Sequence, residues 1–349
     1  MKMEFRMNRL SKLLFCFALI PLFFVPVSCD KEEEQVESVY MTGTVDFDLP
    51  AYMIKGETVT LTAYGITEPE EVVYKWRITD MFTDTLQTNP ITIQLPSESS
   101  KQLSVTALAL AAGYYQSSRT KTVTMVDTAL MTSLKNVSLA GRRFVDQRDG
   151  KLYRYRTVGK LDWFIQNLAY DDHDRYGVAY ENSPATQTFF GRYYSWDEAT
   201  CGESSSGLGC GPQGLCPDGW SVPTNEDWED FALALSGEAL PFSDIWEGLG
   251  EKASVGATFN DEKLWKYSPE NLHTNSSGWN ALPLGNTQYN HKSFLGVNEY
   301  AFFWSSSERS DTQAYYRYIY FDQGSFPANY AGKSGFGANV RCVRLAQEQ

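Results

Sequence analysis

The segment CPDGWSVPTNEDWEDFALAL, residues 216–235, says most about how the C-terminal half of the chain folds. Pro217 and Pro223 bracket a short run that predicts a strand. Thr224 is a good N-cap for a helix, and Asp227 lies in the first turn, where a carboxylate is favourable. Apolar residues then recur at helical spacing, namely Trp228, Phe231, Ala232 and Leu235. We therefore expect a short strand followed by an amphipathic helix.

The composition is that of an ordinary globular protein, with 42% hydrophobic and 21% charged residues. A length of 349 residues allows roughly two domains. With 43 acidic and 30 basic residues, the net charge of −13 argues against nucleic acid as a partner, because phosphate binding needs a basic face. Aromatic residues make up 14% of the chain, whereas three histidines and six cysteines leave little for metal or nucleophile chemistry.

Short motifs rich in glycine and aromatic residues run through residues 141–346. They are, in order, DGKLY (149–153), W-x-x-x-N-L (163–168), GRYYSWDEA (191–199), CPDGWSVPT followed by WE (216–229), GWNALP (278–283), FWSSS (303–307) and VRCVR (340–344). In this order they resemble the Fibrobacter succinogenes major paralogous domain over almost the whole segment. The sequence departs from that family at Ser221 and Trp279, where His and Phe are more usual. We expect an α+β domain with short strands, long loops and two short helices, one of them containing Trp196 and Ala199.

A more distant similarity links the G-W-x-x-P-T pattern and the later W-S-S to the C-type-lectin-like fold of sulfatase-modifying proteins. The sugar-binding calcium loops of lectins have no counterpart, because Glu68-Pro69-Glu70 lies in the other half of the chain and Gly278-Trp279-Asn280 lacks the acid. The copper-using members need two free cysteines, whereas Cys342 is expected to pair. We therefore expect a protein that is not an enzyme.

The three histidines, His173, His273 and His291, are isolated in the sequence, and no metal-binding spacing surrounds them. The segment DDHD (171–174) suggests metal binding, but a solvated acidic turn is the preferred reading. No nucleophile elbow or phosphate-binding loop is present. The sequence therefore predicts neither a cofactor nor a metal.

Four cysteines lie in residues 141–346, and export to an oxidising compartment would favour disulfides among them. Four cysteines allow three pairings. Cys201 and Cys210 share one glycine-rich loop that is flexible enough to close on itself. The family resemblance implies that Cys216 and Cys342 face each other. We therefore expect the pairs Cys201–Cys210 and Cys216–Cys342.

Residues 1–28 are typical of a bacterial lipoprotein signal. A basic start precedes Leu13–Val27, an uncharged run of 15 residues that is too short to span a bilayer comfortably. Ser28-Cys29 then resembles a lipoprotein processing site, although Pro26 stands where an aliphatic residue is usual. The resemblance implies cleavage before Cys29 and acylation of this residue, so that lipid anchors the protein in the membrane.

Residues 29–37 form an acidic tether. The run DKEEE (30–34) resembles the surface-export signal of Bacteroidota lipoproteins, and the alternative is a plain solvated spacer. Removal of the signal takes away four bases and one acid, which leaves 26 bases against 42 acids. We expect an outer-membrane lipoprotein that is exposed on the cell surface.

Residues 38–127 alternate apolar and polar positions with the period of half-buried strands. The runs are Glu57–Ile66, Val72–Met81, Pro90–Leu95, Leu103–Leu110 and Thr120–Val126. Together with a single core residue, Trp76, they suggest an immunoglobulin-like sandwich without cysteines. The segment resembles the Ig-like or PKD-like modules that act as spacers in bacterial surface proteins. Residues 128–140 are then a polar linker.

Two functions follow from this organisation. The first is a non-enzymatic binding or adhesion module that presents its C-terminal domain to a glycan or another surface polymer. Aromatic faces stack on sugars, and Trp246, Trp265 and Tyr289 are the loop residues best suited to this role. The alternative is a structural or fimbria-associated component that contacts another protein. An exposed aromatic cleft favours the first function, and a flat apolar patch or a free strand edge favours the second.

Two short motifs predict covalent sugar on the protein itself. Asp84-Thr85-Leu86 and Asp127-Thr128-Ala129 resemble the O-glycosylation sites of Bacteroidota proteins. Thr85 and Thr128 are therefore candidate modified residues, and the second lies in the expected linker, where exposed chain is accessible.

Overall fold

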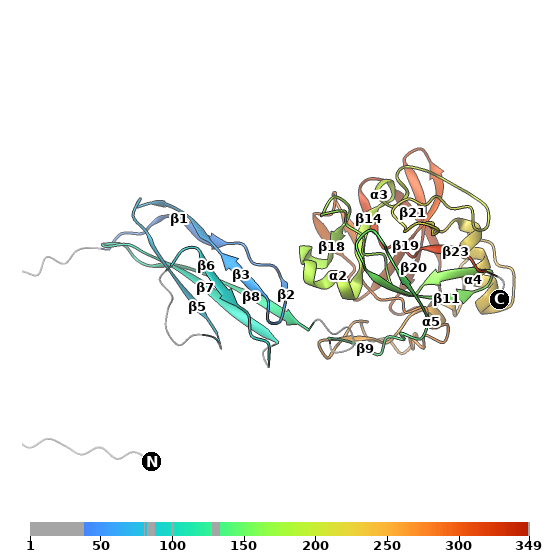
Figure 1. The fold of residues 1–349 in the computed structure, drawn as a ribbon, viewed down its shortest axis with the longest axis horizontal. Helices are drawn as coiled ribbons and strands as arrows, with labels where there is room; N and C mark the ends of the chain where they lie inside the picture. The colour runs from blue at the N-terminus through green and yellow to red at the C-terminus, as the bar shows by residue number, and fades with distance from the viewer. Residues whose placement is uncertain (1–37, 80, 82–87, 99–100, 128–132, 348–349) are drawn as a thin grey trace, which may run out of the picture. The chain divides into compact units, whose positions relative to one another are not determined.

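The structure is a computed structural model that describes residues 38–79, 81, 88–98, 101–127 and 133–347, and strands predominate in it (Figure 1). Cys29, Thr85 and Thr128 lie outside the described residues. Within the described residues, none of the helices is both long and apolar enough to cross a membrane.

Eight strands are described between residues 42 and 126, in three small sheets. They are β1 (Thr42–Phe47), β2 (Tyr52–Ile54), β3 (Thr58–Leu61), β4 (Ala63–Glu68), β5 (Val73–Ile78), β6 (Ile91–Gln94), β7 (Gln102–Leu110) and β8 (Ser117–Val126). The largest sheet has the order β2-β8-β7-β5, and β1 pairs with β4 as β3 does with β6. All pairs are antiparallel except β2 with β8. The expectation that this segment is all-β is confirmed.

The core of these sheets is built by alternation along the strands. On β7 every second residue is buried, namely Leu103, Val105, Ala107 and Ala109. Trp76 on β5 is fully buried, and its ring meets that of Phe47 edge-on with 5.1 Å between centroids. The predicted place of Trp76 in the core is therefore confirmed.

The remaining strands form four sheets with the orders β10-β11-β12-β23, β13-β14-β22-β17-β18, β19-β20-β21 and β16-β15-β9. Their bounds are β9 (Leu134–Lys135), β10 (Arg142–Val145), β11 (Leu152–Val158), β12 (Leu161–Phe164), β13 (Val178–Ala179), β14 (Arg192–Ser195), β15 (Thr258–Phe259), β16 (Glu262–Lys263), β17 (Asn286–Gln288), β18 (Ser293–Leu295), β19 (Tyr300–Ser310), β20 (Gln313–Tyr320), β21 (Ala328–Gly332), β22 (Phe336–Ala338) and β23 (Val343–Leu345). β9 lies within the expected linker, yet it pairs with β15 and its Leu134 is buried.

Four short α-helices and one 3₁₀ helix are described. They are η1 (Tyr180–Asn182), α2 (Pro184–Phe190), α3 (Trp196–Thr200), α4 (Asn225–Ser236) and α5 (Leu249–Ala253). The two expected helices correspond to α3 and α4. α2 was not expected because its sequence does not separate a polar from an apolar face, since the polar Thr186 and Gln187 are buried together with Ala185, Phe189 and Phe190.

Helix α4 begins as its sequence predicts. The Thr224 hydroxyl accepts a hydrogen bond from the Asp227 backbone N–H (3.2 Å), and the Asp227 carboxylate accepts one from the Thr224 N–H (2.9 Å). This reciprocal capping satisfies two N–H groups that the first turn leaves free. Trp228, Phe231 and Ala232 are then fully buried on one face of the helix.

The strand expected between Pro217 and Pro223 is not formed. The segment turns at Gly219, where φ is +79°, and the Trp220 N–H donates to the Pro217 carbonyl. Only Ser221 pairs with a strand residue, in a single bridge to Val343. The predicted strand is therefore wrong, because residues 217–220 form a turn and only Ser221 pairs with β23.

The Arg341 guanidinium lies at the centre of the C-terminal domain and is 1% exposed. It donates to the Asn167 side chain (2.7 Å) and to the carbonyls of Phe164 (3.3 Å), Trp279 (2.8 Å) and Asn280 (2.9 Å). The central carbon of the guanidinium, Cζ, also lies 4.5 Å from the Trp279 ring centroid. Burial lowers the pKa of Arg341 to about 9, so it keeps its charge at neutral pH. One side chain therefore joins three segments that are far apart in sequence.

Next to Arg341, Cys342 is bonded to Cys216 across a sequence separation of 126 residues. This confirms the pairing that the family resemblance implied. Both cysteines are fully buried in the aromatic core. The bond ties the segment before α4 to the last strand of the domain.

The expected pair Cys201–Cys210 is not formed, since both residues are free and exposed. The loop between them does not close on itself, because helix α4 holds it. The Gly207 N–H donates to the Glu226 carboxylate (2.8 Å), and the Gly209 N–H donates to Asp227 (2.6 Å). The flexibility assumed from the glycines is therefore absent from the folded loop.

Replacing Arg341 by methionine should lower the free energy of unfolding by about 3–5 kcal/mol, because several buried acceptors lose their donor at once. Urea unfolding followed by tryptophan fluorescence measures the loss. The matched control is Arg309→Met, since Arg309 is exposed, and we expect it to cost less than about 1 kcal/mol. Equal losses in the two variants would contradict the central place of Arg341.

Alkylation of the folded, unreduced protein followed by peptide mapping should label Cys201 and Cys210. The same map should contain one cross-linked peptide pair that joins Cys216 to Cys342. Because this bond closes a loop of more than 100 residues, its removal should cost about 4–5 kcal/mol by loop-entropy reasoning. A peptide that links Cys201 to Cys210 would overturn the assignment of free thiols.

Candidate functional site

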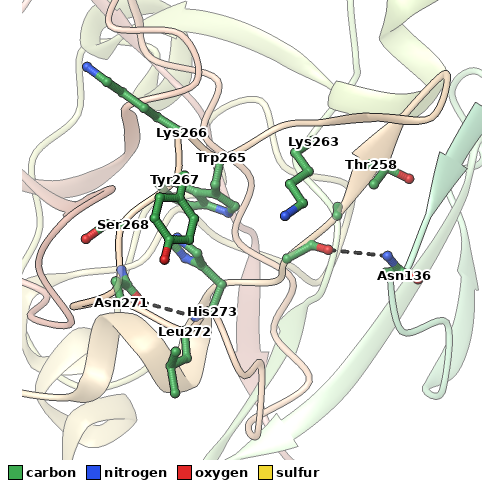
Figure 2. Close-up of a pocket in the computed structure, with 12 residues that line it drawn as sticks. Asn136, Thr258, Lys263, Trp265, Lys266, Tyr267, Ser268, Asn271, Leu272 and His273 are labelled. Carbon is green, nitrogen blue, oxygen red and sulfur yellow. Dashed lines mark hydrogen bonds between the residues drawn. The ribbon is translucent and has the colours of Figure 1, made fainter.

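A cavity in the C-terminal domain is formed mainly by one stretch of chain that folds back on itself between Gly256 and His273, and Asn136 completes its lining (Figure 2). Strands β15 and β16 make a tight hairpin, in which Asn260 and Asp261 both take positive φ angles. The chain then runs along the side of the cavity and returns through a turn that ends at His273. The cavity volume is about 290 Å³, near the lower end for small-molecule sites.

The floor of the cavity is a pair of stacked rings. Trp265 and His273 lie with 4.2 Å between ring centroids and 16° between their planes. The Trp265 indole N–H donates to the Val255 carbonyl (3.0 Å), which fixes one ring. The second ring is held at His273 Nδ1, which lies 2.9 Å from the Ser254 hydroxyl.

The hydrogen bonds around Ser254 also set the protonation of the histidine. The Ser254 hydroxyl donates its proton to the Gly250 carbonyl (2.7 Å), so its oxygen accepts a hydrogen bond from the Nδ1–H of His273. Nε2 is then the unprotonated nitrogen, and it is buried without a partner among the described residues. Burial lowers the pKa of His273 to about 4, and the ring is therefore neutral at physiological pH.

The rim of the cavity is exposed and carries several types of side chain (Figure 2). Tyr267 is 78% exposed and Leu272 is 70% exposed. Lys263 and Lys266 supply two ammonium groups, and Lys266 is paired with Glu299 at 2.9 Å. The Asn271 amide is occupied by the carbonyls of Tyr320 and Gln323, so it stiffens the turn. The cavity thus combines an aromatic floor and rim with polar and cationic groups.

The three residues expected to stack on a ligand, Trp246, Trp265 and Tyr289, differ in their exposure and position. Trp265 belongs to the cavity but is only 5% exposed, and one face of its ring is covered by His273. Trp246 is fully buried beneath the Arg317 guanidinium, whose carbon lies 3.1 Å from the ring centroid. Burial therefore argues against the predicted stacking role of Trp246 and leaves Trp265 with little free ring surface. Tyr289 is 72% exposed but does not line this cavity, and its role in binding stays a prediction.

Arg317 explains why Trp246 is not available. This guanidinium is fully buried and donates to the carbonyls of Phe242, Asp244 (3.1 Å) and Phe326. Burial lowers its pKa to about 8. The cation and the ring pack against each other inside the domain, an arrangement that the loop-like sequence around Trp246 did not reveal.

Sequence reasoning did not single out Tyr267 and Lys263, although both lie at the rim. Tyr267 was one of many aromatic residues in the long-loop half of the domain. Its position just before Ser268-Pro269 is a turn signal that favours exposure. Lys263 had no local signal, because the cavity forms only when the β15–β16 hairpin packs beside His273.

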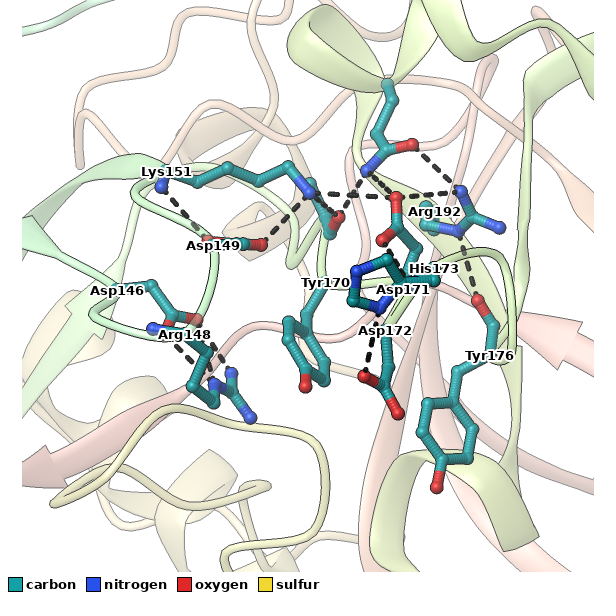
Figure 3. Close-up of polar contacts among 12 residues, drawn as sticks. Asp146, Arg148, Asp149, Lys151, Tyr170, Asp171, Asp172, His173, Tyr176 and Arg192 are labelled. Atoms are coloured by element: carbon teal, nitrogen blue, oxygen red, sulfur yellow. Dashed lines mark hydrogen bonds and ion pairs between the residues drawn. The ribbon is translucent and has the colours of Figure 1, made fainter.

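The acidic segment 171–174 is part of a polar network and is only partly solvated (Figure 3). The His173 side chain is 98% exposed. Asp171 accepts a hydrogen bond from Gln187 (2.9 Å) and lies 3.5 Å from the Arg192 guanidinium, which is nearly buried. Within the described residues, no group of three or more His, Cys, Asp or Glu side chains is placed to hold a metal ion. The network connects the turn to β14.

A second part of this network pins the hairpin that opens the domain (Figure 3). The buried Asp146 carboxylate pairs with Arg148 at 2.7 Å. The Arg148 guanidinium also lies 3.8 Å from the Tyr170 ring centroid and donates to the Leu215 carbonyl (2.9 Å). These contacts have a structural explanation and need no ligand.

His291 lies between a carboxylate and a hydroxyl, in an arrangement that resembles a catalytic relay. Its Nε2 lies 2.9 Å from Glu198 and its Nδ1 lies 2.7 Å from the Thr287 hydroxyl. Burial raises the pKa of Glu198, but hydrogen bonds from His291 and from the Gly177 and Ser195 N–H groups outweigh this effect. Together they lower the pKa to about 2. Thr287 is fully buried, so its hydroxyl is closed to a substrate. The group fastens the β17–β18 hairpin to α3.

The buried neutral His273 should make the stability of the protein depend on pH. Its pKa is about 4 in the folded chain against an ordinary value of 6.5, so the unfolded chain binds the extra proton first. The free energy of unfolding should therefore fall as the pH drops from about 6.5 to 4. Urea titrations across this range should show a shallower fall in His273→Gln. The control His173→Gln, at an exposed site, should follow the wild type, and parallel curves for all three proteins would contradict the burial of His273.

The sequence of the chain was compared with models of known families and with curated proteins. A family model described as the Fibrobacter succinogenes major domain matches residues 156–344. No curated protein matches the chain. The match covers more than half of the chain, including Arg341, the Cys216–Cys342 bond and the whole cavity wall from Gly256 to His273. The chain therefore belongs to the Fibrobacter succinogenes major domain family.

Proposed function

We propose that this protein is a cell-surface lipoprotein whose C-terminal domain binds a glycan, as a non-enzymatic binding or adhesion module. The observation that carries the proposal is the cavity beside Tyr267, where an exposed aromatic face lies above a fixed aromatic floor. A sugar ring offers an apolar face of C–H groups and a rim of hydroxyls. An exposed tyrosine with polar neighbours suits both parts of such a ligand.

The rest of the chain fits the same proposal. The lipid at Cys29 would hold the protein at the outer membrane, and the tether after it would direct the chain to the cell surface. The strands β1–β8 around Trp76 support an immunoglobulin-like spacer. The helices and looped strands of the C-terminal domain are in keeping with a C-type-lectin-like fold. Thr85 and Thr128 remain the proposed sites of O-linked sugar.

The cavity also supports the choice between the two functions considered from sequence. An aromatic cleft favours glycan binding over a structural or fimbria-associated role. Protein contact would instead use a flat apolar surface or a strand edge. The exposed Val73 on the edge strand β5 keeps the second function as the alternative.

A glycan array probed with the purified chain should show binding that depends on Tyr267. Replacing Tyr267 by alanine should weaken binding at least tenfold, because the ligand loses its stacking face. Tyr40→Ala removes a tyrosine that is 80% exposed in the N-terminal half, and we expect it to bind as the wild type does. Loss of binding in Tyr289→Ala but not in Tyr267→Ala would move the site to the β17–β18 hairpin. Absence of glycan binding in every protein would favour the protein-contact alternative.

A further inference from the structure

The charge of the cavity is opposite to that of the chain. The protein has 43 acidic and 30 basic residues, yet none of the twelve residues that line the cavity is Asp or Glu. Two of the twelve are lysines, Lys263 and Lys266. An anionic ligand is repelled by most of this protein surface and meets the opposite sign here. This charge pattern is the first observation that restricts the ligand.

The two lysines are not equivalent. The Lys266 ammonium lies 2.9 Å from Glu299 and 4.8 Å from the Phe321 ring centroid, so its charge is already balanced. Lys263 has no ion pair and no side-chain hydrogen bond to any other described residue. The nearby Asp261 does not neutralise it, because that carboxylate pairs with Lys135. Figure 2 shows the Lys263 side chain between Trp265 and Asn136, beside the cavity floor.

The free charge is a single ammonium. One ammonium balances one carboxylate, whereas phosphate and sulfate groups are usually held by several donors or by the fork of an arginine. No arginine lines the cavity. The hydroxyls of Thr258, Ser268 and Tyr267 donate to no acceptor among the described residues, although the Ser268 hydroxyl accepts a hydrogen bond from the Glu270 N–H (3.1 Å). Such donors suit the hydroxyls of a sugar ring.

We propose that the cavity binds polysaccharides that contain uronic acid residues. The sugar ring lies on the exposed face of Tyr267, its carboxylate pairs with Lys263, and its hydroxyls meet the hydroxyl groups of the rim. This inference rests on the proposed glycan-binding function and names the class of glycan. The volume of about 290 Å³ accommodates a single ring or little more, so the rest of the polymer extends along the surface.

The test uses the purified full-length chain with galacturonan, hyaluronan and alginate. Each is compared with its carboxyl-reduced form, in which the ring is kept and the carboxylate becomes a neutral hydroxymethyl group. We expect the chain to bind at least one acidic polymer, at least tenfold more weakly after reduction, with affinity that falls as salt rises. Lys263→Gln should lose this preference. The matched control Lys292→Gln removes a charge on the exposed turn after β17, outside the cavity, and should keep the preference.

Other outcomes separate this inference from the proposed function. Equal binding of the acidic and reduced forms, or an unchanged preference in Lys263→Gln, overturns the uronic acid assignment while glycan binding stands. Binding of sulfated but not carboxylated glycans overturns it in the same way. If neutral glycans bind and no uronic acid polymer does, the assignment also fails. If no glycan binds at all, both the inference and the proposed function fail.

Discussion

A positive charge buried without a carboxylate determines how this domain is assembled. The Arg341 guanidinium donates its hydrogen bonds to backbone carbonyls and one amide side chain, and it packs against the Trp279 ring. These contacts offset the cost of burying its charge. Burying such a charge is unfavourable unless its donors are satisfied, so the segments that carry these acceptors must come together. They lie in β12, just after it, and in the loop at 279–280. The folded domain therefore depends on one residue near its C-terminal end.

The influence of Arg341 extends to the candidate site through backbone hydrogen bonds. The segment it holds at Trp279 and Asn280 continues into Ala281, whose N–H donates to the Ala253 carbonyl (2.9 Å). The Val255 N–H in turn donates to the Ala281 carbonyl (3.2 Å). Residues 254 and 255 are the ones that fix the rings of His273 and Trp265. A few contacts thus connect the buried guanidinium to the cavity floor.

Predictions that depend on neighbouring residues held best. The capping of α4 involves two side chains three residues apart, and the burial of Trp76 follows from strand alternation, so both could be predicted from the sequence. The Cys216–Cys342 bond joins distant residues and was expected only through the family resemblance. Where the outcome depended on contacts between distant segments, local reasoning failed. Arg317 on β20 covers Trp246, which lies in the segment between α4 and α5, and the first turn of α4 holds the loop between Cys201 and Cys210.

The same limit applies to the candidate site. The sequence predicted aromatic residues in loops, but burial decided which of them a ligand can reach, and Tyr267 and Lys263 line one cavity only in the folded chain. A crystal structure of the protein with a bound uronic acid oligosaccharide tests the account most directly. We expect one sugar ring against Tyr267, with its carboxylate about 3 Å from the Lys263 ammonium. A sugar bound elsewhere, such as at Tyr289, or with its carboxylate in solvent, would contradict the account.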